Sequence, residues 1–453
     1  MEAGIAGIMS LGIGFKVRGS ALRLLLSVCF VFALLFVPAG TYAERSYSPP
    51  ASHVKVALQE ADPDFPDKVD FVLRLEEYAA KRAILNYRPV GRQITSEQEA
   101  EIASTVPPGT DIRVTLDLST HYMPPGVEVE YYWSLFDDAG GTTDTAVKTF
   151  KLLDERYSWQ TLTDDKNGVS VHWYTVRFQE GGSPFGKRLL DTSSQALGRL
   201  EREIGASLER PADIWVYATQ EELASALFEF NPEWVGAQAF PDLGLVLAAI
   251  ADDDTAENEI GRLLPHELSH LVLYQATRNP YNSPPTWLEE GIAVHNQDVR
   301  YPDEEAALRE AASEGRLVPL RALSSPFGAD EETSVLSYAQ VGSVIDFVVE
   351  DERYGPQKLS RTISAFQGGV TYDEALQSGL GVTIDELDKQ WREALPYEVA
   401  APAAPQSTQP AGGQPQFAWS SSPIIIVPLA ICGMMVVAGG ILTLVMLARR
   451  RTA

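Results

Sequence analysis

Cysteine is nearly absent from this sequence of 453 residues. Only Cys29 and Cys432 occur, and each lies in a strongly apolar run near one end of the chain. The part between these runs therefore has no disulfide, and its stability must come from a packed hydrophobic core. The Asn-x-Ser/Thr pattern of N-glycosylation is also missing from the whole sequence. These two absences favour a bacterial protein.

Basic residues are in short supply, with 36 Lys and Arg against 62 Asp and Glu and a net charge of −26. Nucleic-acid binding requires clustered lysine and arginine that neutralise phosphates, so the composition argues against a nucleic-acid partner. The acidic residues are spread along the chain, which is typical of a solvated surface. At this length we expect two or more folded units.

The N-terminal segment has the features of a secretory signal. Lys16, Arg18 and Arg23 precede or open the apolar run LLLSVCFVFALLFV, and small residues follow it before a cleavage site near Ala43. This apolar run is short for a membrane span. We therefore interpret residues 1–43 as a signal peptide, with an uncleaved anchor as the alternative.

The C-terminal segment predicts a membrane anchor. Residues 422–448 are uncharged and long enough to cross a bilayer, and three arginines follow in the tail at 449–453. Arginines directly beyond a span favour its cytoplasmic side, which places the preceding chain outside the cell. Residues 398–421 are rich in Pro, Ala, Gln and Gly and are typical of a flexible linker. We therefore predict a single-pass protein of the cell membrane with an extracytoplasmic main part.

Residues 44–164 have the pattern of an all-β unit. Apolar and polar residues alternate near residues 69–75, 112–118 and 127–135, and the turn sequences PPGT, MPPG and DDAGG lie between or beside these stretches. Short alternating strands joined by tight turns predict a β-sandwich-like domain. No catalytic combination of side chains occurs in it, so we expect a spacer or binding module.

From about residue 165 the periodicity changes. Short apolar strands such as VSVHWYTV and DIWVYA come first, and helical periods dominate from about residue 254 to 397. Residues 165–397 are therefore expected to form an α+β unit. The apolar strand at residues 243–251 precedes the histidine segment directly. It could run along a substrate cleft and pair with an extended peptide, or it could be an ordinary core strand.

The segment LLPHELSHLVLY, residues 263–274, contains two of the six histidines of the chain. His266 and His270 are four residues apart, so in a helix they lie on one face, roughly 5–6 Å apart. This spacing suits two ligands of one zinc ion, and Glu267 stands where a general base for water would act. Two hydrogen-bonded core histidines are the alternative.

The helix that carries these residues has a predicted start and a predicted distortion. We expect it to begin near Asp254, with Glu257 completing a capping pair. Pro265 would then lie inside the helix and clash with the carbonyl of Gly261, so we predict a kink just before His266. Glycine tolerates such a distortion best because it has no side chain.

A catalytic zinc site takes three protein ligands and keeps one position open. Position 276 is alanine, which excludes the third histidine of the metzincin pattern. Downstream, TWLEEGIAVH at residues 286–295 resembles the gluzincin (peptidase MA-like) superfamily of zinc metallopeptidases, whose third ligand is a glutamate in a WL-x-EG-x-A helix. The resemblance puts this ligand at Glu290 and the variable position at Glu289, which we expect to face solvent. We do not expect His295 to be a ligand, because it lies on another face of the helix.

A second segment, LSYAQVGSVIDFVVEDERYG at residues 336–355, also resembles this superfamily, in which a Tyr-Ala pair begins the helix behind the site. The resemblance covers roughly residues 170–395. It implies that Tyr338 donates a hydrogen bond to the oxyanion that develops during hydrolysis. A tyrosine that only packs this helix against the zinc helix is the alternative.

The resemblance implies a gluzincin-like catalytic domain that follows the β-sandwich-like domain and precedes a single transmembrane helix. It implies a metallopeptidase that uses Zn²⁺ and water to hydrolyse peptide or protein substrates, and the two terminal segments predict that this enzyme is membrane-anchored and extracytoplasmic. Glu267 would deprotonate the water while the metal polarises the peptide carbonyl. A protein of another class, a non-catalytic surface binder with a structural metal site, is the alternative. The intact Glu267 favours the enzyme, because a degenerate enzyme has no reason to keep the base.

Overall fold

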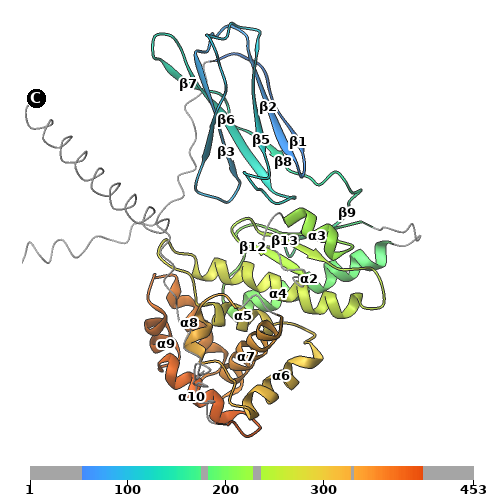
Figure 1. The fold of residues 1–453 in the computed structure, drawn as a ribbon, viewed down its shortest axis with the longest axis vertical. Helices are drawn as coiled ribbons and strands as arrows, with labels where there is room; N and C mark the ends of the chain where they lie inside the picture. Colours follow the sequence, from blue (N-terminus) through green and yellow to red (C-terminus); the bar gives the residue numbers. More distant parts are fainter. Residues whose placement is uncertain (1–53, 175–181, 228–235, 328–330, 401–453) are drawn as a thin grey trace, which may run out of the picture.

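A computed structural model describes four stretches of the chain: residues 54–174, 182–227, 236–327 and 331–400 (Figure 1). The predicted signal peptide, membrane span and cytoplasmic tail lie outside these stretches. Within them, no helix combines the length and the apolar character needed to cross a membrane.

The front unit is built from two antiparallel sheets, at the top of Figure 1. The first sheet has the strand order β1-β2-β5 and consists of β1 (Val56–Asp64), β2 (Lys68–Leu75) and β5 (Asp111–Asp117). The second has the order β4-β3-β6-β7, with β8 also paired to β6, and consists of β3 (Arg82–Pro89), β4 (Ser96–Glu99), β6 (Glu128–Phe136), β7 (Thr142–Asp144) and β8 (Lys148–Lys151).

The alternating sequence pattern of this unit buries every second side chain. Burial alternates strictly along β2, β5 and β6, as expected for strands with one face on a core and one face in water. Phe71, Leu116 and Trp133 are among the inward side chains, and they belong to one hydrophobic cluster that both sheets share. The β-rich front unit predicted from the sequence is confirmed.

The second unit starts with a five-stranded sheet in the order β12-β13-β11-β10-β9. Its strands are β9 (Gln160–Asp164), β10 (Val169–Trp173), β11 (Ala212–Tyr217), β12 (Ala237–Phe240) and β13 (Leu245–Ala249). The three inner strands run parallel, whereas β9 and β12 are antiparallel edge strands. β9 therefore belongs to this sheet, although its residues fall within the front unit as we divided the sequence. The turn DDKNG folds it back onto β10.

Both faces of this second sheet are covered. Ile214, Val216 and Val246 point into a core shared with the helices. Trp215 and Tyr217, which alternate with them along β11, belong instead to the hydrophobic cluster of the front unit. The two units therefore bury apolar surface against each other, which explains why the inner strands are apolar at nearly every position.

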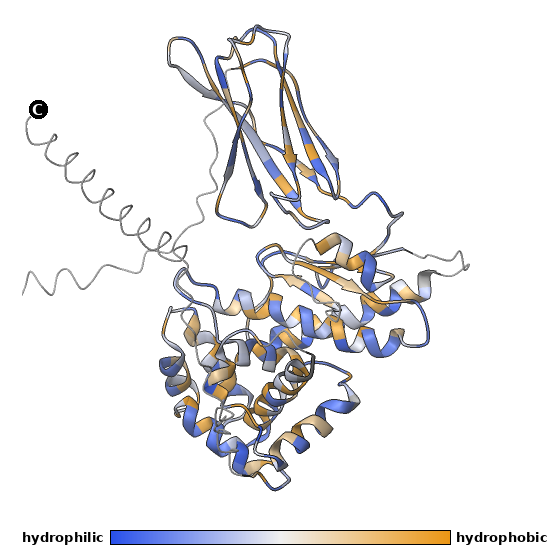
Figure 2. Ribbon diagram, in the orientation of Figure 1, coloured by the Kyte–Doolittle hydropathy of each residue, from blue (hydrophilic) through white to orange (hydrophobic). Residues whose placement is uncertain are grey.

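The rest of the second unit is helical. Helices α2 (Gly182–Ile204) and α4 (Ala256–Thr277) pack together beneath the sheet, and α3 (Gln220–Leu227) follows β11 (Figure 1). The lower part of the molecule consists of α5 (Thr286–His295), α6 (Pro302–Ser313), the 3-10 helix η1 (Leu320–Ser324), α7 (Glu331–Glu350), α8 (Pro356–Phe366), α9 (Tyr372–Gly379) and α10 (Ile384–Ala394). Hydrophilic and hydrophobic residues alternate along these helices, as expected for helices with one face in a common core (Figure 2).

Candidate active site

Helix α4 carries both predicted histidines and begins slightly later than we predicted. The first helical residue is Ala256, and Thr255 is the N-cap, without a capping bond from its own side chain. The carboxylate of Asp253 instead accepts hydrogen bonds from the backbone N–H and the hydroxyl of Thr255. The predicted capping pair of Asp254 and Glu257 is therefore wrong, because the aspartate one position earlier forms the turn that starts the helix.

Pro265 lies inside α4, as predicted. It has no N–H to donate to the carbonyl of Gly261, four residues earlier. The backbone N–H of Asp298 takes this place, and its nitrogen lies 2.8 Å from the Gly261 oxygen. A Cβ atom at Gly261 would lie 3.2 Å from a methyl group of Val299, so the glycine allows this close approach. The segment that follows α5 thus docks onto α4 one turn before His266.

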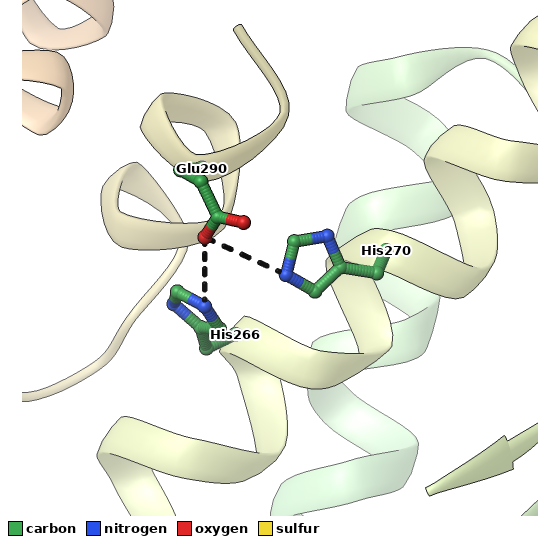
Figure 3. Close-up of side chains that lie close together, drawn as sticks. All are labelled: His266, His270 and Glu290. Carbon is green, nitrogen blue, oxygen red and sulfur yellow. Dashed lines mark ion pairs between the residues drawn. The ribbon is translucent and has the colours of Figure 1, made fainter. Parts of the chain in front are cut away.

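Three side chains from α4 and α5 converge on one point (Figure 3). The Nε2 atoms of His266 and His270 lie 3.4 and 3.8 Å from the same carboxylate oxygen of Glu290. One possible ligand atom from each residue lies within 4.8 Å of the others, and no other such group of three occurs in the described stretches of the chain. The carboxylate comes from Glu290, as the family resemblance implied, and not from its neighbour.

The donor set fits zinc. Two imidazole nitrogens and one carboxylate oxygen form the His₂Glu set of catalytic zinc sites, and both rings turn the same nitrogen toward Glu290. Ligand atoms held about 2.0–2.2 Å from one ion at tetrahedral angles lie roughly 3.3–3.6 Å apart. The two separations from the Glu290 oxygen, 3.4 and 3.8 Å, are close to this range, so one ion could bind all three residues after side-chain movements.

Glu267 lies on the same helix and is buried. Its carboxylate accepts a hydrogen bond from the backbone N–H of Ala239 in strand β12. Burial raises the pKa of Glu267 to about 7. The charge of His270 acts to lower this pKa, and the carboxylate of Glu290 acts to raise it. A divalent cation in the cluster would add positive charge nearby and favour the ionised form of Glu267.

Tyr338 also faces the site. It lines the same cleft as the cluster, and its ring centroid is 6.2 Å from that of His266. Burial raises the pKa of Tyr338, and the carboxylates of Glu290 and Glu267 add to this rise, so the phenol keeps its proton. Helix α7 starts at Glu331, so the Tyr-Ala pair lies inside the helix and not at its beginning.

A cleft of about 660 Å³ opens over the cluster. Strand β12, helix α4, the loop after α4, the start of α5 and residues around Tyr338 form its walls. Glu289 lines the cleft as well, so our expectation that it faces solvent freely is wrong. The first turns of α5 face the cleft, and burial raises the pKa of Glu289 to about 7, with the charge of Glu290 adding to the effect.

The strand beside the cleft is not the one we expected. β13, within residues 243–251, lies inside the sheet between β11 and β12, so it is a core strand and cannot pair with a substrate. The edge strand is β12, and its Ala237 and Ala239 line the cleft. The N–H of Ala249 donates to the carbonyl of Gly236, directly before β12. In an antiparallel pair only every second residue bonds to the partner strand, so the N–H and carbonyl groups of Ala237 and Ala239 point away from β13. The four residues of β12 gave too little pattern to identify this strand from the sequence.

The other described histidines have partners of their own. The Nδ1 atom of His295 lies 2.6 Å from the carboxylate of Asp346, so this histidine does not join the cluster. His172 forms a hydrogen bond with Asp213, and the exposed His121 forms one with the hydroxyl of Thr120. The sixth histidine lies outside the described residues.

The family model of the peptidase MA superfamily matches residues 192–396 of the chain. The matched region contains the histidine cluster, Glu267 and Tyr338. The resemblance that the two motifs predicted is thereby confirmed. It indicates a metallopeptidase.

No curated protein sequence matches this chain. Three solved structures illustrate how distant its structural similarities are. A Br derivative of BhCBM56 is 10% identical, and the match covers 23% of this chain and 99% of that chain with a TM-score of 0.17. The polysaccharide deacetylase BC0361 from Bacillus cereus is 8% identical, with 46% of this chain and 66% of that chain covered and a TM-score of 0.21. The purple acid phosphatase PPD1 from yellow lupin (Lupinus luteus) seeds is 13% identical, with 44% of this chain and 35% of that chain covered and a TM-score of 0.19. These TM-scores are too low to support any conclusion about fold or function.

Proposed function

We propose that this protein is a zinc-dependent metallopeptidase that hydrolyses peptide bonds in peptide or protein substrates. The observation that carries the proposal is the convergence of His266, His270 and Glu290 beneath a cleft that also holds Glu267 and Tyr338. A zinc-binding structural site would need neither the open cleft nor a buried carboxylate beside the ligands. Zinc content measured together with peptide cleavage tests the proposal.

Glu267 is suited to move protons in this site. A zinc ion held by the cluster would supply a Lewis acid that polarises a carbonyl and makes nearby water more acidic. The Glu267 carboxylate then accepts a proton from the attacking water and delivers it to the departing amine. Its burial and its bond from the N–H of Ala239 hold the carboxylate in one orientation.

Strand β12 is suited to hold an extended peptide. Among the described strands it forms an edge of the sheet, and Ala237, whose amide N–H and carbonyl point away from β13, lines the cleft. The carbonyl of Ala239 currently accepts a hydrogen bond from the side chain of Gln238, at 2.9 Å, and that side chain is exposed and can move. An extended substrate peptide paired with β12 would form backbone hydrogen bonds whatever its side chains are. It would also run past Glu267.

Replacing Tyr338 by phenylalanine tests whether this residue acts on the substrate. Within the described residues its hydroxyl has no hydrogen-bond partner, so it is available to a substrate oxygen. If it stabilises the oxyanion, Tyr338→Phe should lower kcat by about 10²–10³-fold and leave KM nearly unchanged. Steady-state kinetics on a cleaved peptide measure both constants. A variant with wild-type kcat and an unchanged melting temperature would show that Tyr338 only packs α7 against its neighbours.

We further propose that the second unit stands outside the cell membrane on a linker at residues 398–421, anchored by the uncharged segment 422–448. The sequence pattern supports this proposal, because three arginines follow the segment directly. The cleft would then face substrates outside the cytoplasm.

Limited proteolysis of intact cells tests this topology. An added protease should release a soluble fragment that contains the cleft, because the Pro- and Gln-rich linker offers the most accessible bonds. Immunoblotting of the supernatant, with a cytoplasmic protein as lysis control, detects the fragment. Complete protection of the chain in intact cells, with cleavage after permeabilisation, would contradict an outward-facing site.

A further inference from the structure

Gln297 lies just after α5 and contacts the face of His266 that points away from the cluster. Its side-chain nitrogen Nε2 is 3.0 Å from the Nδ1 atom of His266. Its side-chain oxygen Oε1 is buried and has no hydrogen-bond partner. A buried acceptor without a donor is uncommon in folded proteins, and rotation of this amide would bring the acceptor to a partner.

The direction of this hydrogen bond decides whether His266 can bind a metal. A neutral imidazole carries its proton on one nitrogen only. When Nε2 of Gln297 donates to Nδ1, the proton of His266 must lie on its own Nε2, the atom that faces Glu290 at 3.4 Å. Ligation through that atom requires the opposite tautomer, in which Nδ1 carries the proton and needs an acceptor. The unused Oε1 of the same amide is such an acceptor, and a half-turn of the amide brings it to Nδ1.

We propose that Gln297 is a positioning residue of the metal site, whose Oε1 accepts the Nδ1–H of His266 and so leaves Nε2 free to bind zinc. This inference rests on the proposed zinc site. With the amide oriented as it is here, its Nε2 faces Nδ1, and the imidazole proton lies on the Nε2 atom that faces Glu290.

The carbonyl that Pro265 leaves free in helix α4 explains how Gln297 comes to lie beside His266. Pro265 frees the carbonyl of Gly261, which accepts the backbone N–H of Asp298 at 2.8 Å. Pro265 immediately precedes His266 in the sequence, and Asp298 immediately follows Gln297. The bond from Asp298 to Gly261 therefore fixes the backbone on one side of Gln297.

A second set of bonds fixes the backbone on the other side. The N–H of Gln297 donates to the carbonyl of Val294, 3.2 Å away at the end of α5. The guanidinium group of Arg199 in α2 contacts both the carbonyl of Asn296, at 3.0 Å, and the carboxylate of Asp298, at 2.9 Å. Three helices thus hold this short segment, so the amide can rotate while its backbone stays in place.

His270 has no comparable support. Among the residues that the structure describes, no side chain forms a hydrogen bond with its Nδ1 atom, which lies beside the open cleft. Within the described part of the chain, Gln297 is accordingly the one side chain that can select the tautomer of a ligand histidine in this cluster. Its removal should weaken zinc binding without abolishing it, because three ligands remain.

Zinc affinity measured by competition with a chromogenic chelator tests the proposal on the full-length protein in detergent. Gln297→Met keeps the size of the side chain but removes the acceptor, and it should weaken zinc binding by about 10–100-fold. Gln297→Glu keeps only acceptor atoms and should bind zinc at least as tightly as the wild type. Gln367→Met, at an exposed position after α8, serves as the control for a methionine introduced elsewhere.

Two results would overturn the role of Gln297. One is wild-type zinc affinity in Gln297→Met. The other is a loss in Gln297→Glu as large as that in Gln297→Met, because a carboxylate can accept but cannot donate. Gln297→Ala replaces the methionine variant if melting curves show that the latter does not fold. A wild-type protein that binds no zinc would instead overturn the proposed function. A wild-type protein that binds zinc but cleaves no peptide would overturn the proposed peptidase activity, and the comparison of zinc affinities would still decide the role of Gln297.

Discussion

Glu267→Gln is expected to lower kcat for peptide hydrolysis by about 10²–10⁴-fold while the zinc content stays at one ion per chain. Glutamine has nearly the same shape as glutamate, and its side-chain oxygen can still accept the N–H of Ala239. It cannot take up a proton from water, so only the proton transfer is lost. Steady-state kinetics and metal analysis of the same preparation measure the two quantities.

Glu257→Gln is the matched control, because this glutamate lies in the first turn of the same helix with its side chain 81% exposed, away from the cleft. It should keep the wild-type kcat. Turnover of Glu267→Gln within a few-fold of the wild type, at full zinc content, would show that another group accepts the proton.

Removal of a ligand should have the largest effect on the metal. Replacing His266, His270 or Glu290 by alanine is expected to reduce the zinc content from about one ion per chain to near none after dialysis, because a site with two remaining ligands binds zinc weakly. Activity should fall with the metal. Metal analysis by mass spectrometry and melting curves of the zinc-free forms separate loss of metal from loss of fold.

The glutamate pair of α5 provides an internal control for this prediction. Glu289→Ala should keep its zinc, because the carboxylate that reaches both histidines belongs to Glu290. Loss of zinc in Glu289→Ala together with its retention in Glu290→Ala would move the ligand by one residue and contradict the geometry of Figure 3.

The parts of the site that share one helical face could be predicted from the sequence. The i, i+4 spacing alone places His266 and His270 together, and the motif around Glu290 indicated the third member of the cluster. The alternating pattern of the front unit likewise predicted its strands, because one face of each is buried.

The parts that depend on tertiary contacts could not be predicted. The order of strands in the second sheet inserts β12 between β13 and the cleft, although β13 comes directly before α4 in the chain. The exposure of Glu289 depends on how α5 is turned toward α4 and not on its own sequence. Gln297 belongs to no motif. Its position depends on the hydrogen bond from the neighbouring Asp298 N–H to the carbonyl of Gly261, which lies thirty-six positions before Gln297 in the sequence.

The central claim is that the cluster and cleft form a working peptidase. The most direct test is cleavage of a mixed peptide library by full-length protein that has been stripped with a chelator and reloaded with one equivalent of zinc. We predict cleavage that depends on zinc and is absent from Glu267→Gln. A wild-type protein that holds one zinc ion per chain and cleaves no peptide faster than Glu267→Gln would contradict this account and identify a binding protein with a structural metal site.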